Sequence, residues 1–268
     1  MADPIAEFKA KQREGWASFV PVEVMTTPPA ARLVRFAGVK AGQRVLDVAC
    51  GTGVVALTAR RQGANVTGLD LTPELLSHAK ENGAAVGFED VAWREGDVED
   101  LPYEDASFDV VLSQFGHMFA PRPDVATKQM LRVLKPGGTI AFSTWPPELA
   151  VGRIFATVGK HAPPPPADVS PPPQWGDVGL VRQRVGDAVR DLRFDRGVLR
   201  WPALSPAHYR AHLEAVSAPV KSLVRSLQGE PAKLRQLRAE IEAVAAEYFE
   251  PDENIIRMEY LMTRATKA

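Results

Sequence analysis

The stretch VLDVACGTG at positions 45–53 combines an apolar run with a glycine-rich turn. The apolar residues predict a buried strand over 43–48, and the glycines that follow end it. A helix is predicted over 54–62, so the turn connects a strand to a helix. Turns of this kind bring a ligand close to bare backbone, because glycine leaves room that a side chain would fill. The stretch therefore predicts a cofactor site at the first strand–helix connection.

The segments that follow repeat the alternation of strand and helix. Each predicted strand is a continuous apolar run, which is typical of strands covered on both faces of a sheet. Five alternations within 43–145 predict an α/β fold, a doubly wound Rossmann-like parallel sheet with helices on both faces. The further strands are predicted over 64–69, 91–94, 108–113 and 139–144, and the helices over 73–82 and 123–134, after two N-terminal helices over 5–16 and 29–37.

The chain changes in character after Trp145, because prolines crowd positions 163–173 and predict an extended segment there. We interpret 1–40 as an N-terminal helical cap segment and 41–147 as the cofactor-binding core. Residues 148–268 then complete the same domain with a helical cap and two more strands. The elements predicted in this last region are a strand over 190–201, helices over 206–227 and from Pro231, and a strand over 255–265.

Composition and charge narrow the class of protein. The 268 residues carry a formal net charge of -1 at pH 7, so nothing favours nucleic acid as a partner. Residues 1–16 mix acids and bases where a signal peptide requires an apolar run. No stretch reaches the roughly 20 apolar residues of a membrane span. We therefore expect a cytoplasmic protein, a monomer or a homodimer, whose partner is a small molecule.

The glycine pattern alone also fits NAD-binding proteins, and Asp47 separates the two possibilities. At the end of the first strand its carboxylate would repel a pyrophosphate and attract an α-ammonium group. Asp70, 19 residues after Gly51, would accept hydrogen bonds from ribose hydroxyls or, alternatively, only cap the next helix. Asp97 would accept from an adenine amine or be a surface turn residue. The predicted cofactor-binding residues are Asp47, Ala49, Gly51, Gly53, Asp70, Leu71, Asp97, Val98, Ser113 and Gln114.

At this point the sequence resembles the class I S-adenosylmethionine-dependent methyltransferases, in the small-molecule branch similar to the ubiquinone and menaquinone biosynthesis enzymes. The resemblance implies S-adenosylmethionine as cofactor, with Asp47 and the glycines at its methionine part, Asp70 at the ribose, and Asp97 at the adenine. It also implies a seven-stranded sheet whose last strand is antiparallel, and a cap over the substrate. The segments that carry it are VLDVACGTG (45–53), VTGLD (66–70), GDVEDLPYEDASFDVVLS (96–113) and MLRVLKPGGTIAFSTW (130–145).

Several single residues invite a chemical role. His117 follows the fourth predicted strand and is a candidate general base or substrate-orienting donor, unless it is a loop histidine without chemistry. Trp16 is added to the cofactor site because an aromatic face attracts a sulfonium cation, although it could simply pack a helix. Cys50 is interpreted as a small residue beside the cofactor. His208 and His212 have the spacing of a metal pair but lack the rest of a motif, so no metal is predicted.

The predicted reaction is an in-line SN2 methyl transfer to a small-molecule acceptor. Positioning supplies most of the catalysis in such a reaction, because the sulfonium donor is already activated. One alternative is a catalytically silent domain that binds S-adenosylmethionine as a sensor or partner. The other is an NAD(P)-dependent oxidoreductase, which Asp47 and the lack of a Tyr-x-x-x-Lys pair disfavour. No pattern in the sequence names the acceptor.

Overall fold

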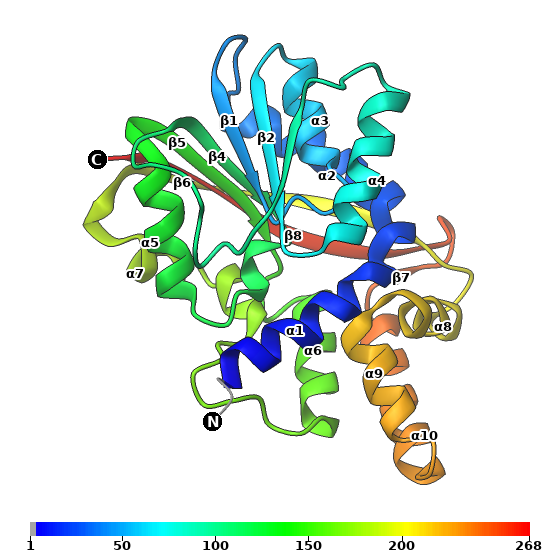
Figure 1. Cartoon of the computed structure of the whole chain (residues 1–268). Helices are drawn as coiled ribbons and strands as arrows, with labels where there is room; N and C mark the ends of the chain where they lie inside the picture. The colour runs from blue at the N-terminus through cyan, green and yellow to red at the C-terminus, as the bar shows by residue number, and fades with distance from the viewer. Residues whose placement is uncertain (1–3) are drawn as a thin grey trace.

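Among residues 4–268, which the computed structural model describes, eight strands form one sheet (Figure 1). Its order is β3-β2-β1-β4-β5-β8-β6, and the two-residue β7 pairs with β8. The strands from β3 to β5 are parallel, whereas β8 is antiparallel to both of its long neighbours. The bounds are β1 Arg44–Val48, β2 Asn65–Asp70, β3 Ala92–Glu95, β4 Phe108–Gln114, β5 Leu134–Thr144, β6 Val189–Pro202, β7 Phe249–Glu250 and β8 Ile255–Lys267.

The expected doubly wound sheet with an antiparallel last strand is confirmed, and the short β7 adds an eighth strand. No helix among the described residues is long and apolar enough to cross a membrane. The α-helices are α1 Pro4–Trp16, α2 Glu23–Ala37, α3 Val54–Arg61, α4 Pro73–Ala85, α5 Pro123–Val133, α6 Ala150–His161, α7 Val178–Val185, α8 Pro206–Val216, α9 Ala218–Ser226 and α10 Pro231–Ala246, with 3-10 turns η1 Ala17–Val22, η2 His117–Phe119, η3 Pro172–Gly176 and η4 Gly186–Ala188.

The sheet is covered on both faces, and each face has its own apolar core. Successive residues of a strand point to opposite faces, so Val45 and Leu46 of β1 enter different cores. Val45 joins the core beneath α2 and α3, which includes Leu33. Leu46 joins the larger core beneath α5, which includes Met130 and continues into the helices of the cap. Burial on both sides explains why the strands read as continuous apolar runs.

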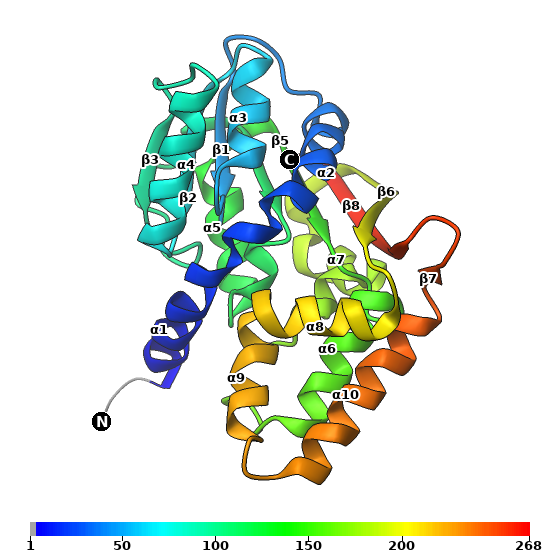
Figure 2. The same ribbon diagram turned by 90° about the vertical axis from the view of Figure 1, so that its right-hand side faces the viewer.

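The cap consists of α6, α8, α9 and α10, which gather beyond one end of the sheet (Figures 1 and 2). Helix α10 packs against both α6 and α8, and α9 contacts α6 and the N-terminal helix α1. All four cap helices come from chain between β5 and β8, so the two strands that pair there hold the cap against the sheet.

The structure differs from the predicted elements in several places. The helix predicted over 206–227 is two helices, because Ser217 adopts extended backbone and a second helix begins at Ala218 with Pro219 in its first turn. Helix α2 begins at Glu23, before its prolines, and α6 was not predicted. Strand β5 begins at Leu134, earlier than the strand predicted over 139–144, and residues 135–138 form a bulge within it. The strand predicted over 190–201 is present as β6, with an irregular register between Arg190 and Arg193.

Candidate functional site

A pocket opens at the carboxyl ends of β1, β2 and β4, where the strand order reverses between β1 and β4. Ligands of open α/β sheets bind at this switch point. We call the part that follows the strand ends, with Asp47, Gly51, Asp70 and Asp97, the strand half. We call the part contributed by the cap and the strands beneath it the cap half, which is lined by Val151, Phe155, Leu199, Trp201, Tyr209, Leu213, Val216, Ser217, Pro219 and Met258.

Asp47 is the most deeply placed charged residue of the strand half, with 1% of its surface exposed. Its Oδ2 accepts a hydrogen bond of 3.0 Å from the backbone N–H of Ala56 in α3. Its Oδ1 is buried and accepts none from any described residue. Burial raises the pKa of Asp47 well above its ordinary value, and the nearby Asp70 carboxylate raises it further. A carboxylate oxygen left in this state fits a cationic ligand group.

The glycine turn provides open space beside Asp47. Gly51 has a left-handed φ of 53°, and a Cβ added there would meet nothing within 4 Å, so the space in front of it is free for a ligand. Ala49 also has a positive φ, 53°, although it is not a glycine. A Cβ at Gly116 would lie 2.6 Å from the Cβ of Ala49, so the loops after β1 and β4 meet with no room for a larger residue. Such strained positions concentrate at binding sites.

Asp70 at the end of β2 holds the turn in place. Its Oδ2 accepts from the backbone N–H of Gly51 at 2.8 Å, and its Oδ1 accepts from that of Thr72 at 2.9 Å. Burial raises the pKa of Asp70, an effect that these backbone donors oppose. Each carboxylate oxygen has a second lone pair, so both remain able to accept a hydrogen bond from a ligand hydroxyl.

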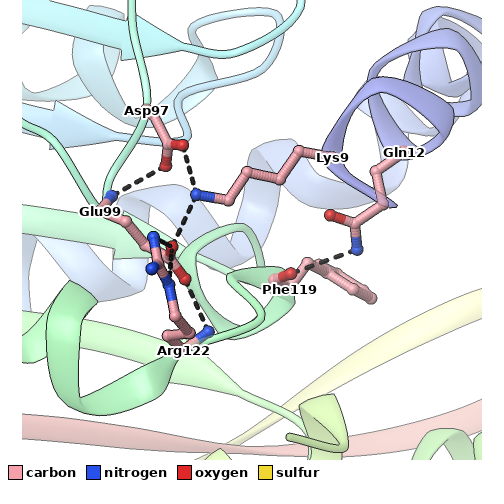
Figure 3. A network of polar contacts seen from close by, with 6 residues as sticks. All are labelled: Lys9, Gln12, Asp97, Glu99, Phe119 and Arg122. Carbon is pink, nitrogen blue, oxygen red and sulfur yellow. Dashed lines mark hydrogen bonds and ion pairs between the residues drawn. The ribbon is translucent and has the colours of Figure 1, made fainter. Parts of the chain in front are cut away.

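Asp97 belongs to a charge network that ties the N-terminal helix to the core (Figure 3). The Nζ of Lys9 in α1 lies 2.5 Å from Asp97 Oδ2 and 2.6 Å from Glu99 Oε2. Glu99 also accepts from the backbone N–H of Arg122 at 2.6 Å and from its Nε at 2.8 Å. The Glu99 side chain is 1% exposed, so three donors compensate a buried carboxylate. Gln12, one turn further along α1, donates to the carbonyl of Phe119.

The cap half is apolar and aromatic. Every pocket-lining residue from Phe115 to Met258 is uncharged, within the part of the chain that the structure describes. Phe115 stacks on Trp145 with ring centroids 4.1 Å apart. Trp201 meets Tyr209 edge to face at 5.7 Å. Burial raises the pKa of Tyr209, and its hydroxyl makes no hydrogen bond with another described residue.

The structure brings most of the predicted site residues to one pocket. Gly53, Ser113 and His117 do not line it, although each follows or ends a strand that does contribute. The ring of Trp93 lies where a Cβ of Gly53 would be, and Ser113 donates to the carbonyl of Val48 at 2.7 Å. The predicted residues that line the pocket are Trp16, Asp47, Ala49, Gly51, Asp70, Leu71, Asp97, Val98 and Gln114.

His117 is the first residue of η2, and its side chain points into the core. Its side chain has 0% exposure and its ring contacts those of Phe142 and Trp175 at 4.7 and 4.6 Å. Neither ring nitrogen has a hydrogen-bond partner among the described residues. Burial lowers the pKa of His117 to about 3, and the positive charge of Arg184 contributes to the shift. The imidazole is therefore neutral and separate from the pocket surface.

The other singled-out residues are placed as follows. Cys50 is buried at the pocket, and burial raises the pKa of its thiol, which disfavours the reactive thiolate. The rings of His208 and His212 are 4.2 Å apart, and His208 Nδ1 accepts from the backbone N–H of Leu204. Residues 4–268 contain no group of three or more side chains arranged to hold a metal ion.

Sequence reasoning missed Lys9 and Glu99. The topology argument places Phe115 with Ser113 and Gln114 at the end of the fourth strand, and the structure puts Phe115 in the pocket lining. Lys9 and Glu99 are 90 residues apart, and nothing in the local pattern around either links them.

The comparisons with known proteins agree with this geometry. A family model described as a methyltransferase domain matches residues 46–142. An uncharacterized protein of Mycobacterium tuberculosis is 36% identical over 246 residues, which cover 91% of this chain and 89% of that protein. The demethylmenaquinone methyltransferase of Staphylococcus aureus is 42% identical over 124 residues, 45% of this chain and 51% of that enzyme.

A solved structure shows the same fold. It is phosphoethanolamine N-methyltransferase 2 of Haemonchus contortus in complex with S-adenosyl-L-methionine, with a TM-score of 0.57 and 15% identity. The alignment covers 90% of this chain and 52% of that one. The comparisons favour neither the NAD(P)-dependent oxidoreductase nor the silent binding domain. The chain belongs to the class I S-adenosylmethionine-dependent methyltransferases, and S-adenosylmethionine is its methyl donor.

Proposed function

We propose that this methyltransferase acts on a small, uncharged and largely apolar acceptor, held in the cap half of the pocket for in-line SN2 transfer. The observation that carries the proposal is the lining itself, which is uncharged throughout the cap half among the described residues. A charged acceptor would lose its hydration there without gaining a partner, which is costly in a protein interior.

The strand half would hold the donor in one orientation. S-adenosylmethionine, when bound, supplies a methyl group on a positively charged sulfur. The unpaired Oδ1 of Asp47 would accept from the α-ammonium group, and the space before Gly51 would take the methionine chain. Asp70 would accept from the ribose hydroxyls, and Asp97 with the backbone of Val98 would bind the adenine. Trp16 and Gln114 line the same pocket and would close the site around these groups.

The cap half would hold the acceptor by shape and by few polar contacts. Its aromatic side chains, among them Phe155 and Trp201, suit a ring-bearing molecule because aromatic pairs add to the burial of apolar area. Among the described residues that line the cap half, Tyr209 is the one with a titratable side chain. Its raised pKa keeps the hydroxyl protonated, so Tyr209 can donate a hydrogen bond. Its hydroxyl would orient an oxygen or nitrogen of the acceptor.

Proton removal by a protein base is not part of the proposal. His117, the candidate base predicted from the sequence, is buried away from the pocket with a pKa of about 3. Holding donor and acceptor in line can supply on the order of 7–11 kcal/mol of the barrier in well-oriented models. The acceptor should therefore be a phenol, an enol or a thiol whose own proton is acidic enough to pass to water, while the methyl–sulfur bond breaks and the new bond to the acceptor oxygen, carbon or sulfur forms.

The test pairs acceptors of the same ring size, one neutral and one carrying a carboxylate, and measures methyl transfer as S-adenosylhomocysteine formed. We expect kcat/KM to be at least about tenfold higher for the neutral partner, because burying an unpaired charge costs more than 1.4 kcal/mol. Leu213→Lys should reduce this preference by placing a cation in the cap half. Preference for the charged partners would contradict the proposed acceptor class. Tight S-adenosylhomocysteine binding with no turnover across the panel would instead favour a silent binding domain.

Three sequence predictions stay proposals of the same kind. They are the cytoplasmic location, the monomeric or homodimeric state, and the division into an N-terminal cap segment (1–40), a core (41–147) and a completing region (148–268).

A further inference from the structure

Helix α1 lies over the pocket, although none of its described residues is fully buried. Lys9, Gln12 and Trp16 of this helix line the pocket. Within Pro4–Trp16, all of which the structure describes, no residue is fully buried. A helix without a buried apolar face is held by particular contacts, and each of these can be examined separately.

Besides the Lys9 ion pairs, several further contacts connect α1 to the rest of the molecule. Gln12 donates to the carbonyl of Phe119, and the Trp16 ring lies 4.5 Å from the Phe119 ring. Gly15 packs so closely on α9 that an added Cβ would lie 2.6 Å from the Cβ of Ala218. Arg13 pairs with Glu95 at 2.9 Å, but both side chains are more than 40% exposed. Exposed pairs of this kind contribute little, because water and salt screen them.

The Lys9 contact is different in kind because it lies largely out of water. The Lys9 side chain is 14% exposed, and its two partners Asp97 and Glu99 are 26% and 1% exposed. Both ion pairs are short, and Glu99 is fixed from its other side by Arg122. Figure 3 shows the ammonium group between the two carboxylates, at the point where α1 meets the loop after β3. A partly desolvated ammonium group is screened less than a surface pair.

The Lys9 contact is connected to the cofactor site through Asp97, because Asp97 also lines the pocket. Its Oδ1 accepts from the backbone N–H of Glu99 at 2.8 Å, and its Oδ2 is the oxygen paired with Lys9. The carboxylate is therefore held in one orientation by a loop amide on one side and by a lysine of α1 on the other.

We propose that Lys9 is a positioning residue of the cofactor site. It fixes the Asp97 carboxylate and fastens α1 over the strand half, so that S-adenosylhomocysteine leaves when the Lys9 ion pairs with Asp97 and Glu99 open. The proposal rests on cofactor binding in the strand half and does not depend on which acceptor the cap half takes.

The test measures the dissociation rate of S-adenosylhomocysteine by stopped flow, with no acceptor present. Lys9→Met should raise this rate about tenfold, because truncating one member of a desolvated ion pair acts mainly on dissociation. Lys9→Arg keeps the charge and should restore most of the slow rate. Lys11→Met is the matched control, since Lys11 lies on the same helix, is 73% exposed and pairs only with Glu7 among the described residues. It should leave the rate unchanged.

Hydrogen exchange over residues 4–16 gives a second measurement that does not use turnover. In the wild type, S-adenosylhomocysteine should slow exchange in α1, and this protection should be lost in Lys9→Met but kept in Lys11→Met. Gly15→Leu, which pushes α1 away from α9 without touching Asp97, should also speed dissociation.

Wild-type dissociation and wild-type protection in a folded Lys9→Met variant would overturn the proposal. If Lys9→Met does not fold, a wild-type dissociation rate in Gly15→Leu would overturn it, since α1 would then not control release. Because the ligand is S-adenosylhomocysteine alone, an error in the proposed acceptor class would appear as missing turnover and leave both measurements as they are.

Discussion

Replacing Asp47 by asparagine should make the protein more stable without ligand and less stable with it. Asparagine has nearly the same shape, and its Oδ1 can still accept from the N–H of Ala56. The substitution removes the charge of a carboxylate that is 1% exposed and has one unpaired oxygen. A buried unsatisfied group costs about 1–3 kcal/mol, and the new amide N–H₂ stays partly unsatisfied, so the gain should be about 1 kcal/mol. For a chain of this size that raises Tm by roughly 2–4 °C.

The liganded state should change in the opposite direction. S-adenosylhomocysteine at about 100 times its Kd stabilises the wild type by about 2.7 kcal/mol. Losing the carboxylate partner of a buried ammonium costs about 2–5 kcal/mol, and about 2.7 kcal/mol corresponds to a hundredfold weaker Kd. At the same ligand concentration the variant would then gain only about 0.4 kcal/mol. The order of the two melting temperatures should therefore reverse on addition of ligand.

The effect should also depend on pH with a defined sign. The pKa of Asp47 in the folded protein lies above its ordinary value of 3.8, so the folded state keeps a proton that the unfolded chain has already lost. The stability of the wild type relative to Asp47→Asn should therefore fall as pH rises from about 4 through the raised pKa. Asp109→Asn is a control of opposite sign, because the Lys135 ammonium lowers the pKa of Asp109 and its stabilisation is present at neutral pH.

Thermal unfolding at pH 5 and pH 7.5, with and without S-adenosylhomocysteine, measures all of these effects. The reasoning is refuted if unliganded Asp47→Asn melts at or below the wild type at pH 7.5. It is equally refuted if the ligand still gives the variant the full shift.

Three more substitutions test other parts of the site. Asp70→Ala should weaken S-adenosylhomocysteine by about tenfold or more in calorimetry, because it removes the ribose acceptor and frees the Gly51 turn; unchanged affinity would exclude the ribose assignment. Tyr209→Phe should raise the KM for the acceptor by about tenfold and leave the Kd of S-adenosylhomocysteine unchanged, which steady-state kinetics with calorimetry would check. His117→Leu should keep the pH profile of activity. Between pH 6.5 and pH 5 the wild type should lose about 2 kcal/mol of stability that His117→Leu keeps, as measured by unfolding at the two pH values. The buried histidine, with a folded pKa of about 3, stays neutral over this range, whereas the histidine of the unfolded chain becomes protonated and favours unfolding. A shifted activity profile would restore His117 as a candidate base.

The core and the strand half could be predicted from the sequence because both follow from local patterns. Continuous apolar runs mark the strands, and the parallel topology brings their carboxyl ends to one edge. Asp47, Gly51 and Asp70 lie at those ends, so their meeting in one pocket needs no knowledge of distant contacts. The opening of the pocket between β1 and β4, where the strand order reverses, follows from the same topology.

Position after a strand does not decide which side chain reaches the pocket, as His117 shows. Phe115 adopts a left-handed φ of 57°, and η2 begins two residues later. This turn sends the Phe115 ring to the pocket and the His117 ring to the core. Sequence patterns do not encode such a reversal, because a positive φ in a phenylalanine is set by its surroundings.

Contacts between distant segments were also outside the reach of sequence patterns. Lys9 and Glu99 each look like ordinary surface charges, and their burial depends on how α1 docks. The break at Ser217 agrees with the preference of proline for the first turn of a helix, where Pro219 lies. Proline alone does not decide where a helix ends, because α2 runs through Pro28 and Pro29.

The position of β8 between β5 and β6 has a consequence for how the enzyme is made. Strands β1 to β5 and the strand half precede residue 145, whereas the cap half depends on Leu199 and Met258, which β8 brings together. The N-terminal part of a chain leaves the ribosome first and can begin to fold before the rest has been made. The donor site should therefore assemble on the ribosome before an acceptor site exists, and β6 should remain open to protease in a nascent chain arrested before residue 255. Specificity for the acceptor would then be the last property that the chain acquires.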